Sequence, residues 1–233
     1  MLKVNSGILF IVATPIGNLE DITLRAIEVL KNVDTIACED TRVSRKLLDH
    51  FDIKKPLLSL HQHSDEKVIS DIIDRLKGGE NIAYITDGGT PGVSDPGQKL
   101  VNNVKLITNN SGKQITILPI PGASAVVAAI SVSGMVEKEF YFAGFLPKKK
   151  GRQTKMIELS KIAIPIVIYE SALRLERTLA DIETYFGRDC EIFIAREMTK
   201  MFEEYWGGKI SEVLKNIHSH KLKGEIVLIV KHY

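Results

Sequence analysis

The chain has 233 residues, of which 44% are hydrophobic and 26% are charged, and this composition excludes a disordered or fibrous protein. The 31 Lys and Arg residues are offset by 29 Asp and Glu residues, so the net charge of +2 does not by itself indicate a nucleic-acid-binding protein. Cys38 and Cys190 are too few for a disulfide framework, and the first apolar segment, residues 8–13, is too short for a signal peptide or a membrane span. We therefore expect a cytoplasmic protein.

Short apolar segments rich in β-branched residues alternate with amphipathic segments along the chain. Strands are predicted at residues 8–13, 35–38, 82–86, 115–118, 140–145, 164–169, 191–195 and 226–230. Helices are predicted between them where apolar residues recur at helical spacing, in the sets Ile22, Ala26, Val29, Leu30 and Val33; Ile69, Ile72, Ile73 and Leu76; and Leu175, Leu179, Ile182 and Phe186. This alternation predicts an α/β fold built on parallel sheets.

Local signals indicate helix starts and one domain boundary. Asp21 is predicted to cap a helix that begins at Ile22, and Asp95 precedes a proline at the position that a first helical turn prefers. The Pro-Ile-Pro-Gly segment at residues 119–122 follows a predicted strand near the middle of the chain. We therefore expect two α/β domains, residues 1–118 and residues 119–233.

Three loops rich in glycine, proline and small polar residues follow predicted strands, at residues 14–18, 87–97 and 119–125. Ligands of open parallel sheets bind outside the carboxyl ends of the strands, so we expect these loops to meet around one ligand. Glycine lets backbone groups approach a ligand closely, although each loop taken alone also fits a tight turn. The sequence has no P-loop motif, and no G-x-G-x-x-G motif follows the first strand, so a nucleoside would have to be held in another way.

Charged side chains gather after three other predicted strands. They are Glu39, Asp40 and Arg42 after the second strand, Glu170 and Arg174 after the strand ending at residue 169, and Arg196, Glu197 and Lys200 after the strand ending at residue 195. An isolated ion pair on a surface usually has no function. The shared position at strand ends nevertheless makes these side chains candidates for a functional site.

A basic segment and two histidine pairs complete the candidate features. The basic segment contains Lys148, Lys149, Lys150, Arg152 and Lys155, which suits contact with a phosphate backbone, although a solvated loop explains it almost as well. The histidine pairs, at residues 61/63 and 218/220, have no third ligand at the spacing of a metal site. No serine lies in a G-x-S-x-G motif. We therefore expect neither a metal site nor serine hydrolysis.

Seven segments together carry a family resemblance. They are VATPIGNLEDIT at residues 12–23, EDTR at 39–42, TDGGTPGVSDPG at 86–97, PGASA at 121–125, GFLP at 144–147, YES at 169–171 and REMTK at 196–200. In this order they resemble the small-subunit ribosomal RNA methyltransferases of the tetrapyrrole methylase superfamily. The resemblance covers essentially the whole chain.

The resemblance implies a two-domain α/β homodimer that binds S-adenosylmethionine in a cleft between its domains. It implies methyl transfer to the ribose 2′-hydroxyl of a cytidine in small-subunit (16S) ribosomal RNA. By analogy, the residues expected to contact the methyl donor are Pro15, Gly89, Thr90, Val93, Ser94, Asp95, Ser124, Ala125, Tyr169, Ala195 and Gly224. Two features differ from the family pattern: Leu173 stands where a histidine is usual, and the chain ends at residue 233, before the C-terminal extension of many members.

This chemistry needs the hydroxyl oxygen to be held in line with the methyl group, so most of the rate comes from positioning, without a metal. A carboxylate can accept the hydroxyl proton, and a cation can orient the ribose phosphate. The candidate acids are Glu39, Asp40, Glu170 and Glu197, and the candidate cations are Arg42, Arg174, Arg196 and Lys200. The sequence alone does not rank them.

Two alternative functions remain open from the sequence. One is a methyltransferase of the same superfamily that acts on a small porphyrinoid, and the other is a non-catalytic ribosome-assembly factor. For the RNA methyltransferase we expect Lys148, Lys149, Lys150 and Arg152 to contact RNA phosphates, and the target to be accepted only within a structured RNA or assembled particle. An apolar patch of Met201, Phe202, Tyr205 and Trp206 is the candidate dimer contact.

Overall fold

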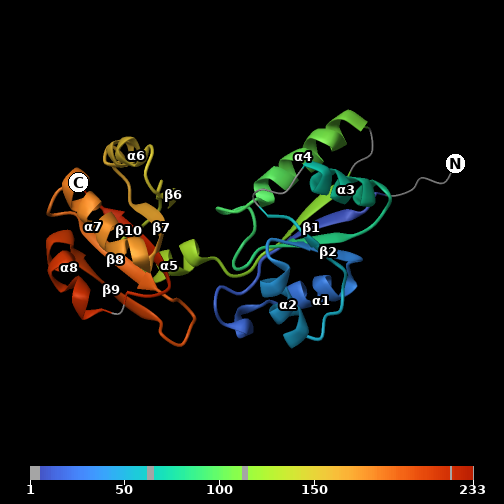
Figure 1. Ribbon diagram of the computed structural model, residues 1–233, viewed down its shortest axis with the longest axis horizontal. Coiled ribbons are helices and arrows are strands. Elements are labelled where there is room, and N and C mark those ends of the chain that lie inside the picture. The colour runs from blue at the N-terminus through green and yellow to red at the C-terminus, as the bar shows by residue number, and fades with distance from the viewer. Residues whose placement is uncertain (1–5, 62–65, 112–114, 221, 233) are drawn as a thin grey trace. The chain divides into compact units, whose positions relative to one another are not determined.

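The structure is a computed structural model that describes residues 6–61, 66–111, 115–220 and 222–232. The chain divides into two compact units, Met1–Ser124 and Ala125–Tyr233 (Figure 1). Each unit is built on its own five-stranded sheet with helices packed against it. Within the described residues, none of the helices has the length and apolar character needed to cross a bilayer.

The first unit is a doubly wound parallel sheet with strand order β3-β2-β4-β1-β5. Its strands are β1 (Ile8–Val12), β2 (Thr35–Cys38), β3 (Leu57–Ser59), β4 (Ile82–Ile85) and β5 (Thr116–Ile120). Its helices are α1 (Leu24–Asn32), α2 (Thr41–His50), α3 (Glu66–Lys77) and α4 (Gly97–Ser111), after a short 3-10 helix at Leu19–Asp21. Every residue of β2 and β4 is buried, because helices cover both faces of the sheet.

Two apolar clusters hold this unit together, one on each face of the sheet. Leu9 and Tyr84 face the cluster formed with α3 and α4, whereas Val12 and Ile36 face the cluster formed with α1 and α2. The alternation of side chains along each strand therefore divides the apolar residues between the two layers of helices. A parallel sheet packed with helices is what the sequence predicted for both domains.

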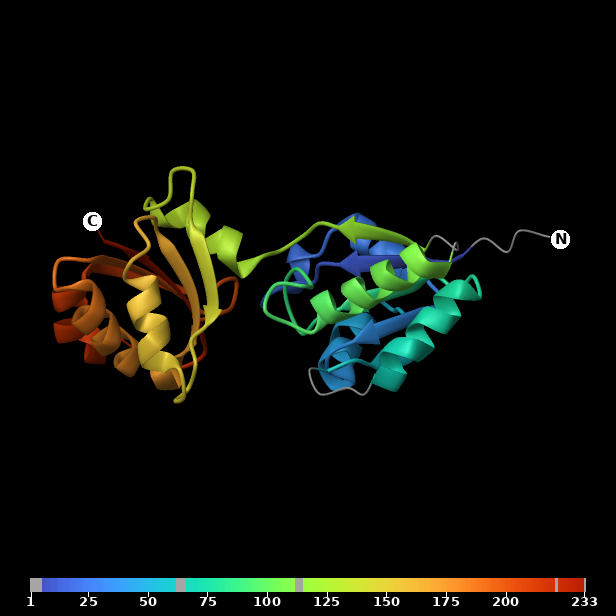
Figure 2. The same ribbon diagram turned by 90° about the horizontal axis from the view of Figure 1, so that it is seen from above.

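The second unit has the strand order β6-β7-β10-β8-β9. Its strands are β6 (Tyr141–Phe145), β7 (Ile166–Ser171), β8 (Glu191–Arg196), β9 (Glu204–Lys209) and β10 (Glu225–Lys231). Helices α6 (Arg152–Leu159), α7 (Ala172–Phe186) and α8 (Ile210–Asn216), followed by a 3-10 turn at Ile217–Ser219, cover one face, and α5 (Ala125–Ser133) packs on β10 from the other side (Figure 2).

The prediction of a parallel sheet was wrong for the second unit. Only β6 and β7 are parallel, while β7–β10, β10–β8 and β8–β9 are antiparallel pairs. The short connection between β8 and β9 reverses the chain directly, and this hairpin leaves no room for a crossover helix. The sequence missed β9 because it is largely exposed and contains two glycines, Gly207 and Gly208, and it missed the three-residue strand β3 as well.

Two boundary predictions also differ from the structure. The division between the units falls after Ser124, six residues beyond the predicted boundary at 118, because β5 stays hydrogen bonded to β1 through Ile120. Asp21 does not cap a helix: it lies in the 3-10 turn, and the Thr23 hydroxyl accepts the N–H of Ala26 at the start of α1, 3.1 Å away. The predicted helix start after Asp95 agrees with α4, which begins at Gly97.

Candidate functional site

The three small-residue loops meet at the carboxyl edge of the first sheet, as the sequence predicted. They follow β1, β4 and β5, which are neighbours in the order β4-β1-β5. Thr14 and Gly89 exchange two backbone hydrogen bonds of 3.0 and 2.9 Å, so the first loop is joined to the second. The Thr90 hydroxyl donates to the carbonyl of Ala123 over 3.0 Å, which joins the second loop to the third. Hydrogen bonds therefore link the three loops into one continuous structure at this edge of the sheet, which we call the rim of loops.

Glycine at two positions allows these loops to approach each other. A Cβ on Gly122 would lie 2.9 Å from the Cβ of Ala13, closer than two carbon atoms can approach. Gly89 has φ of +89°, and a Cβ there would touch the Ile16 side chain at 3.4 Å. A larger residue at position 122 would push the first and third loops apart, whereas at position 89 it would strain the backbone.

Asp95 shapes the middle loop from within. One carboxylate oxygen accepts the N–H groups of Gly92 and Val93 at 2.7 and 3.0 Å, and the other accepts the N–H of Gly97 at 2.7 Å. Val93 and Ser94 are exposed at the tip, and Ser94 has φ of +72°. Of the residues predicted to contact a methyl donor, Asp95 thus has a clear role in folding the loop, and Val93 and Ser94 are the ones that the loop presents outward.

An open hollow of about 380 Å³ lies at the same edge of the first sheet, at the ends of β2, β3 and β4. Its lining residues are Glu39, Asp40, Thr41, Arg42, Ser59, His61 and Asp87. The Asp40 carboxylate caps α2 by accepting the N–H of Arg42 at 2.8 Å, and it binds the Arg42 guanidinium through both oxygens at 3.1 and 2.6 Å. An Asp87 oxygen accepts the backbone N–H of Asp40 at 3.1 Å, which connects this hollow to the loop at 87–97.

The two neighbouring acids of this hollow differ in their electrostatics. Hydrogen bonds from Arg42 lower the pKa of Asp40 to about 2, so this carboxylate stays ionised and paired. Partial burial raises the pKa of Glu39, and the carboxylates of Asp87 and Asp95 raise it further. Glu39 therefore binds a proton more readily than Asp40, which ranks two acids that the sequence could not separate.

In the second unit, the predicted donor contacts Tyr169 and Ala195 lie in one row across the sheet. Both pair in register with Val227 of β10, so their side chains share a face. This row lies on the face that α6, α7 and α8 do not cover, because Ile168 and Ile194, one residue away on each strand, belong to the core beneath those helices. Gly224 lies just before β10, and its carbonyl accepts the N–H of Ala172 at 3.1 Å.

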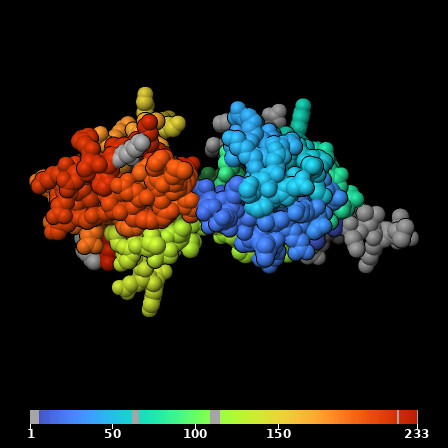
Figure 3. Space-filling model, turned by 90° about the horizontal axis from the view of Figure 1, so that it is seen from below, coloured from blue at the N-terminus to red at the C-terminus, as the bar shows by residue number. Residues whose placement is uncertain are grey.

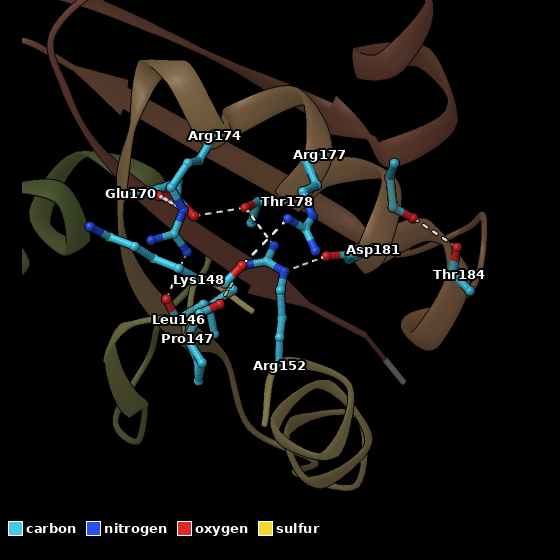
Figure 4. Close-up of polar contacts among 11 residues, drawn as sticks. Leu146, Pro147, Lys148, Arg152, Glu170, Arg174, Arg177, Thr178, Asp181 and Thr184 are labelled. Carbon is cyan, nitrogen blue, oxygen red and sulfur yellow. Dashed lines mark hydrogen bonds and ion pairs between the residues drawn. The ribbon is translucent and has the colours of Figure 1, made fainter. Parts of the chain in front are cut away.

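Alternation along β7 places Glu170 on the opposite face from Tyr169, in the layer of helices. Its side chain has no exposed surface, and its oxygens bind the Thr178 hydroxyl at 2.7 Å and the Arg174 guanidinium at 3.2 Å (Figure 4). A Glu170 oxygen also accepts the backbone N–H of Ser171 at 2.8 Å. The prediction grouped Glu170 and Arg174 with the other acids and cations. The structure instead places them in a buried network on α7.

The remaining charged candidates form further ion pairs around the β8–β9 turn. Arg196 is buried and binds Glu204 at 3.0 Å, while Lys200 binds Glu197 and Glu225 at 2.8 and 2.9 Å. Burial alone would raise the pKa of Glu197, but hydrogen bonds from Lys200 and from the backbone N–H of Glu225 bring the pKa below its usual value. Glu197 therefore holds the turn together as a paired carboxylate.

The predicted basic segment is divided in two by the fold. Lys148, Lys149 and Lys150 are exposed between β6 and α6, and no ion pair to them is found in the described parts of the chain. Arg152 is only 4% exposed, and its guanidinium binds Asp181 at 2.6 Å, Thr178 at 2.8 Å and the carbonyl of Pro147 at 3.2 Å (Figure 4). The amphipathic pattern of α6 explains this difference, because Arg152 shares a face with the buried Met156 and Leu159.

A second hollow, of about 340 Å³, lies on the second unit beside β8 and β9. Figure 3 shows the orange to orange-red surface of this part of the second unit bordering the yellow-green surface of α5 and the residues after it. Tyr205 and Trp206 line it, and the Trp206 ring stacks on His220 with 4.2 Å between centroids. Met201 and Phe202 are exposed on the preceding turn.

The histidine pair at 218/220 contacts acidic side chains, and both cysteines are buried. His220 binds Glu204 at 2.6 Å and His218 lies 3.8 Å from Glu176, whereas residue 63 falls outside the described residues. Among the residues that the structure describes, no group of three or more His, Cys, Asp or Glu side chains is arranged to hold a metal ion. Both cysteines are free and buried.

Comparison with known proteins identifies similar sequences and folds. The family profile described as Tetrapyrrole (Corrin/Porphyrin) Methylases matches residues 9–214. Proteins named Ribosomal RNA small subunit methyltransferase I are similar: the one from Thermotoga maritima is 44% identical over 96% of this chain and 98% of its own, and the one from Bacillus subtilis is 43% identical over 98% and 76%.

Solved structures with the same fold have much lower sequence identity. Diphthine synthase superposes with a TM-score of 0.71 at 13% identity, covering 97% of this chain and 90% of its own. Uroporphyrin-III C-methyltransferase from Thermus thermophilus, complexed with S-adenyl homocysteine, superposes with a TM-score of 0.63 at 15% identity, covering 97% of both chains. At these identities the likeness shows the fold alone.

Proposed function

Because the chain belongs to the tetrapyrrole (corrin/porphyrin) methylase family, we propose that it is an S-adenosylmethionine-dependent methyltransferase of small-subunit (16S) ribosomal RNA. The acceptor is the ribose 2′-hydroxyl of a cytidine. The observation that supports this proposal most strongly is the 42–44% identity, over 96–98% of this chain, to relatives that share the name of a small-subunit ribosomal RNA methyltransferase.

The rim of three loops in the first unit fits a methyl donor with an adenosyl group. Gly89 and Gly122 hold the loops close together, and Val93 and Ser94 present the tip of the middle loop outward. Pro15, Gly89, Thr90, Val93, Ser94, Asp95 and Ser124 are the proposed donor-binding residues of this unit, and Ala125, Tyr169, Ala195 and Gly224 are those of the second. When bound, the donor supplies an electrophilic methyl group, and the protein supplies position and orientation.

Glu39 is the proposed acceptor of the hydroxyl proton. It lies in the hollow beside the loop at 87–97, and its raised pKa makes it a better base than the ion-paired Asp40. Arg42 is largely exposed beside it, so its guanidinium can face an RNA phosphate while Asp40 fixes its position. Glu39 would take the hydroxyl proton as the ribose oxygen forms its bond to the methyl carbon and the bond between that carbon and the donor's sulfur breaks, with S-adenosylhomocysteine as the leaving group.

The RNA contact is assigned to Lys148, Lys149 and Lys150. Their exposed ammonium groups can neutralise phosphates, and a net charge of +2 supplies little attraction elsewhere. Recognition therefore depends on the shape of a folded RNA or an assembled particle. We further propose a homodimer through the exposed apolar side chains Met201, Phe202 and Tyr205, and a location in the cytoplasm, where ribosomes are assembled.

The direct test is to map ribose methylation by mass spectrometry in small-subunit RNA from cells with and without the gene. We expect one cytidine 2′-O-methyl group to disappear with the gene and to return when purified small subunits are incubated with the protein and the donor. Unchanged RNA methylation, together with methylation of a porphyrinoid, would identify a small-molecule enzyme instead. Particle binding without turnover would identify an assembly factor.

The RNA contact has its own matched control. Replacement of Lys148, Lys149 and Lys150 by Ala should raise the apparent KM for particles and flatten its dependence on salt. Replacement of Lys31, Lys46 and Lys105, three exposed lysines of the first unit, removes the same charge and should leave both unchanged. Equal effects of the two triple variants would show that only net charge matters.

A further inference from the structure

Three consecutive carbonyl groups that lead into the exposed lysines are each bound by a different arginine. Arg174 donates to the carbonyl of Leu146 over 2.7 Å, Arg152 to that of Pro147 over 3.2 Å, and Arg177 to that of Lys148 over 3.4 Å (Figure 4). Two of these arginines come from α7 and one from α6. An ordinary exposed loop has its carbonyls bound to water, so this segment is held unusually firmly.

Two of the three arginines, Arg174 and Arg152, are themselves held by one connected network. Glu170 binds Arg174 at 3.2 Å and accepts the Thr178 hydroxyl hydrogen at 2.7 Å. Because that hydroxyl donates to Glu170, its lone pair accepts from Arg152, which lies 2.8 Å away. Asp181 completes the network by binding Arg152 at 2.6 Å. Each of these contacts is a direct hydrogen bond or ion pair between buried or partly buried side chains.

The spacing of these residues explains how one helix supplies the network. Arg174, Thr178 and Asp181 recur at three- and four-residue intervals, so they share the face of α7 that meets the segment before α6. A buried group of charges is a poor way to stabilise a fold, because desolvation offsets most of the attraction between them. It does specify a single arrangement of the groups that it binds, since any other arrangement leaves buried charges unpaired.

We propose that this network, formed by Glu170, Arg174, Thr178, Arg152 and Asp181, is a positioning device that presents Lys148, Lys149 and Lys150 to the phosphates of the substrate RNA. Glu170 and Arg174 are then positioning residues that act through the lysine segment, and neither takes part in proton transfer. This inference rests on the proposed function. It deepens that proposal by naming the residues that prepare the RNA-binding surface.

The physical advantage is preorganisation. A free segment of three lysines would lose backbone freedom each time it met a phosphate, and that loss would weaken binding. Here the three arginines already hold the carbonyls of residues 146–148, and the N–H of Arg152 donates to the carbonyl of Lys149 at 3.2 Å, so less backbone freedom is left to lose on binding. The expected effect of breaking the network is therefore weaker particle binding with an unchanged maximal rate.

The decisive pair of variants is Thr178→Val and Thr178→Ser. Valine has nearly the shape of threonine but leaves Glu170 and Arg152 each without one partner, whereas serine keeps the hydroxyl. Arg188→Ala is the matched control, because Arg188 makes an exposed ion pair with Glu183 just beyond the same helix. All variants would first be compared with the wild type for binding of S-adenosylhomocysteine by calorimetry.

Two measurements follow: hydrogen exchange of the amides at residues 148–151, and binding of small subunits at increasing salt without the methyl donor. We expect Thr178→Val to speed the exchange and to weaken particle binding by about tenfold, with kcat at saturating particles unchanged. Thr178→Ser and Arg188→Ala should match the wild type in all of these. If Thr178→Val does not fold, Arg174→Lys, which keeps the charge but loses the fork of donors, serves in its place with the same expectation.

Faster exchange with unchanged particle binding would overturn the inference, because the segment would then be ordered for a reason other than RNA. A loss of kcat in Glu170→Gln with normal exchange and normal particle binding would overturn it as well, since Glu170 would then act in the reaction itself. Failure of the proposed function gives a different result. The wild type would then not methylate the particle, while the binding and exchange ratios between variants would still decide the role of the network.

Discussion

The two units use the ends of their strands in different ways. In the first unit, small residues at the ends of β1, β4 and β5 bring backbone segments into contact, and the charged groups around Asp40 stay near solvent. In the second unit, the charged groups after β7 turn inward onto α7, and Glu170 and Arg152 are almost completely buried. The first unit thus offers a rim built from backbone, and the second a surface segment supported by buried charges.

This difference shows that the role of a charged side chain cannot be predicted from its position at the end of a strand. Glu39 directly follows β2 and Glu170 lies next to the end of β7, yet one lines a hollow and the other has no contact with solvent. The deciding factor is what covers the strand end. Glu39 lines the open hollow at the end of β2, whereas Thr178 of α7, the helix that directly follows β7, binds Glu170.

The largest expected effect on the free energy of unfolding is at the buried ion pairs of the second unit. Arg152→Ala should destabilise the second unit by about 3–5 kcal/mol, because Asp181 and Thr178 lose a buried partner. Arg42→Ala, in the first unit, removes a guanidinium that is 88% exposed and should leave the unfolding midpoint unchanged. Urea unfolding would be followed by the fluorescence of Trp206, the only tryptophan, which reports on the second unit, and by circular dichroism, which reports on both units. A similar loss from both substitutions would contradict the contrast between the units.

The next effect concerns Glu39. Glu39→Gln should lower kcat by about a hundredfold, because the amide cannot accept the hydroxyl proton. In the wild type the rate should rise with pH through the pKa of Glu39, which lies above its ordinary value, and level off once the carboxylate is ionised. Asp87→Asn removes a neighbouring negative charge and should move this rise to lower pH. A pH profile that keeps its shape in Glu39→Gln would assign the proton to another group.

A smaller effect is expected at the rim of loops. Gly122→Ala places a Cβ 2.9 Å from that of Ala13 and should weaken S-adenosylhomocysteine binding by about tenfold as the third loop moves outward. Gly134→Ala is the control. A Cβ there meets nothing within 4 Å, so its only cost is the backbone strain of an alanine at φ of +65°. Calorimetric titration with S-adenosylhomocysteine measures the dissociation constant of each variant. Equal affinities would mean that the third loop has no part in donor binding.

The fold of the first unit was largely predictable because its signals are local. Buried parallel strands are continuous apolar segments, and the glycine-rich loops follow them directly. The resemblance to ribosomal RNA methyltransferases of the tetrapyrrole methylase superfamily is confirmed by the family profile and by the relatives of 42–44% identity. The predicted fold of the first unit and the family resemblance both rest on short sequence segments that can be interpreted without the rest of the chain.

The second unit was harder to predict because its determinants are far apart in the sequence. The antiparallel course of β10 depends on pairing with β7 and β8, which lie dozens of residues earlier. Arg152 looked like one more cation beside Lys148–Lys150, and only its partner Asp181, 29 residues away, shows that it is buried. The helical spacing of Arg152, Met156 and Leu159 was the one local signal that could have separated it from the lysines.

The smallest expected effect tests a helix start in the first unit, where sequence and structure disagree by two residues. Thr23→Ala should cost about 1 kcal/mol, because the hydroxyl that accepts the N–H of Ala26 is lost. Asp21→Ala should cost almost nothing, since Asp21 lies in the 3-10 turn before the cap and its carboxylate is exposed. Thermal unfolding monitored by circular dichroism can compare the two variants at one protein concentration. A larger loss from Asp21→Ala would restore the helix start predicted from the sequence, and would mean that the cap forms two residues earlier than the hydrogen bond of Thr23 indicates.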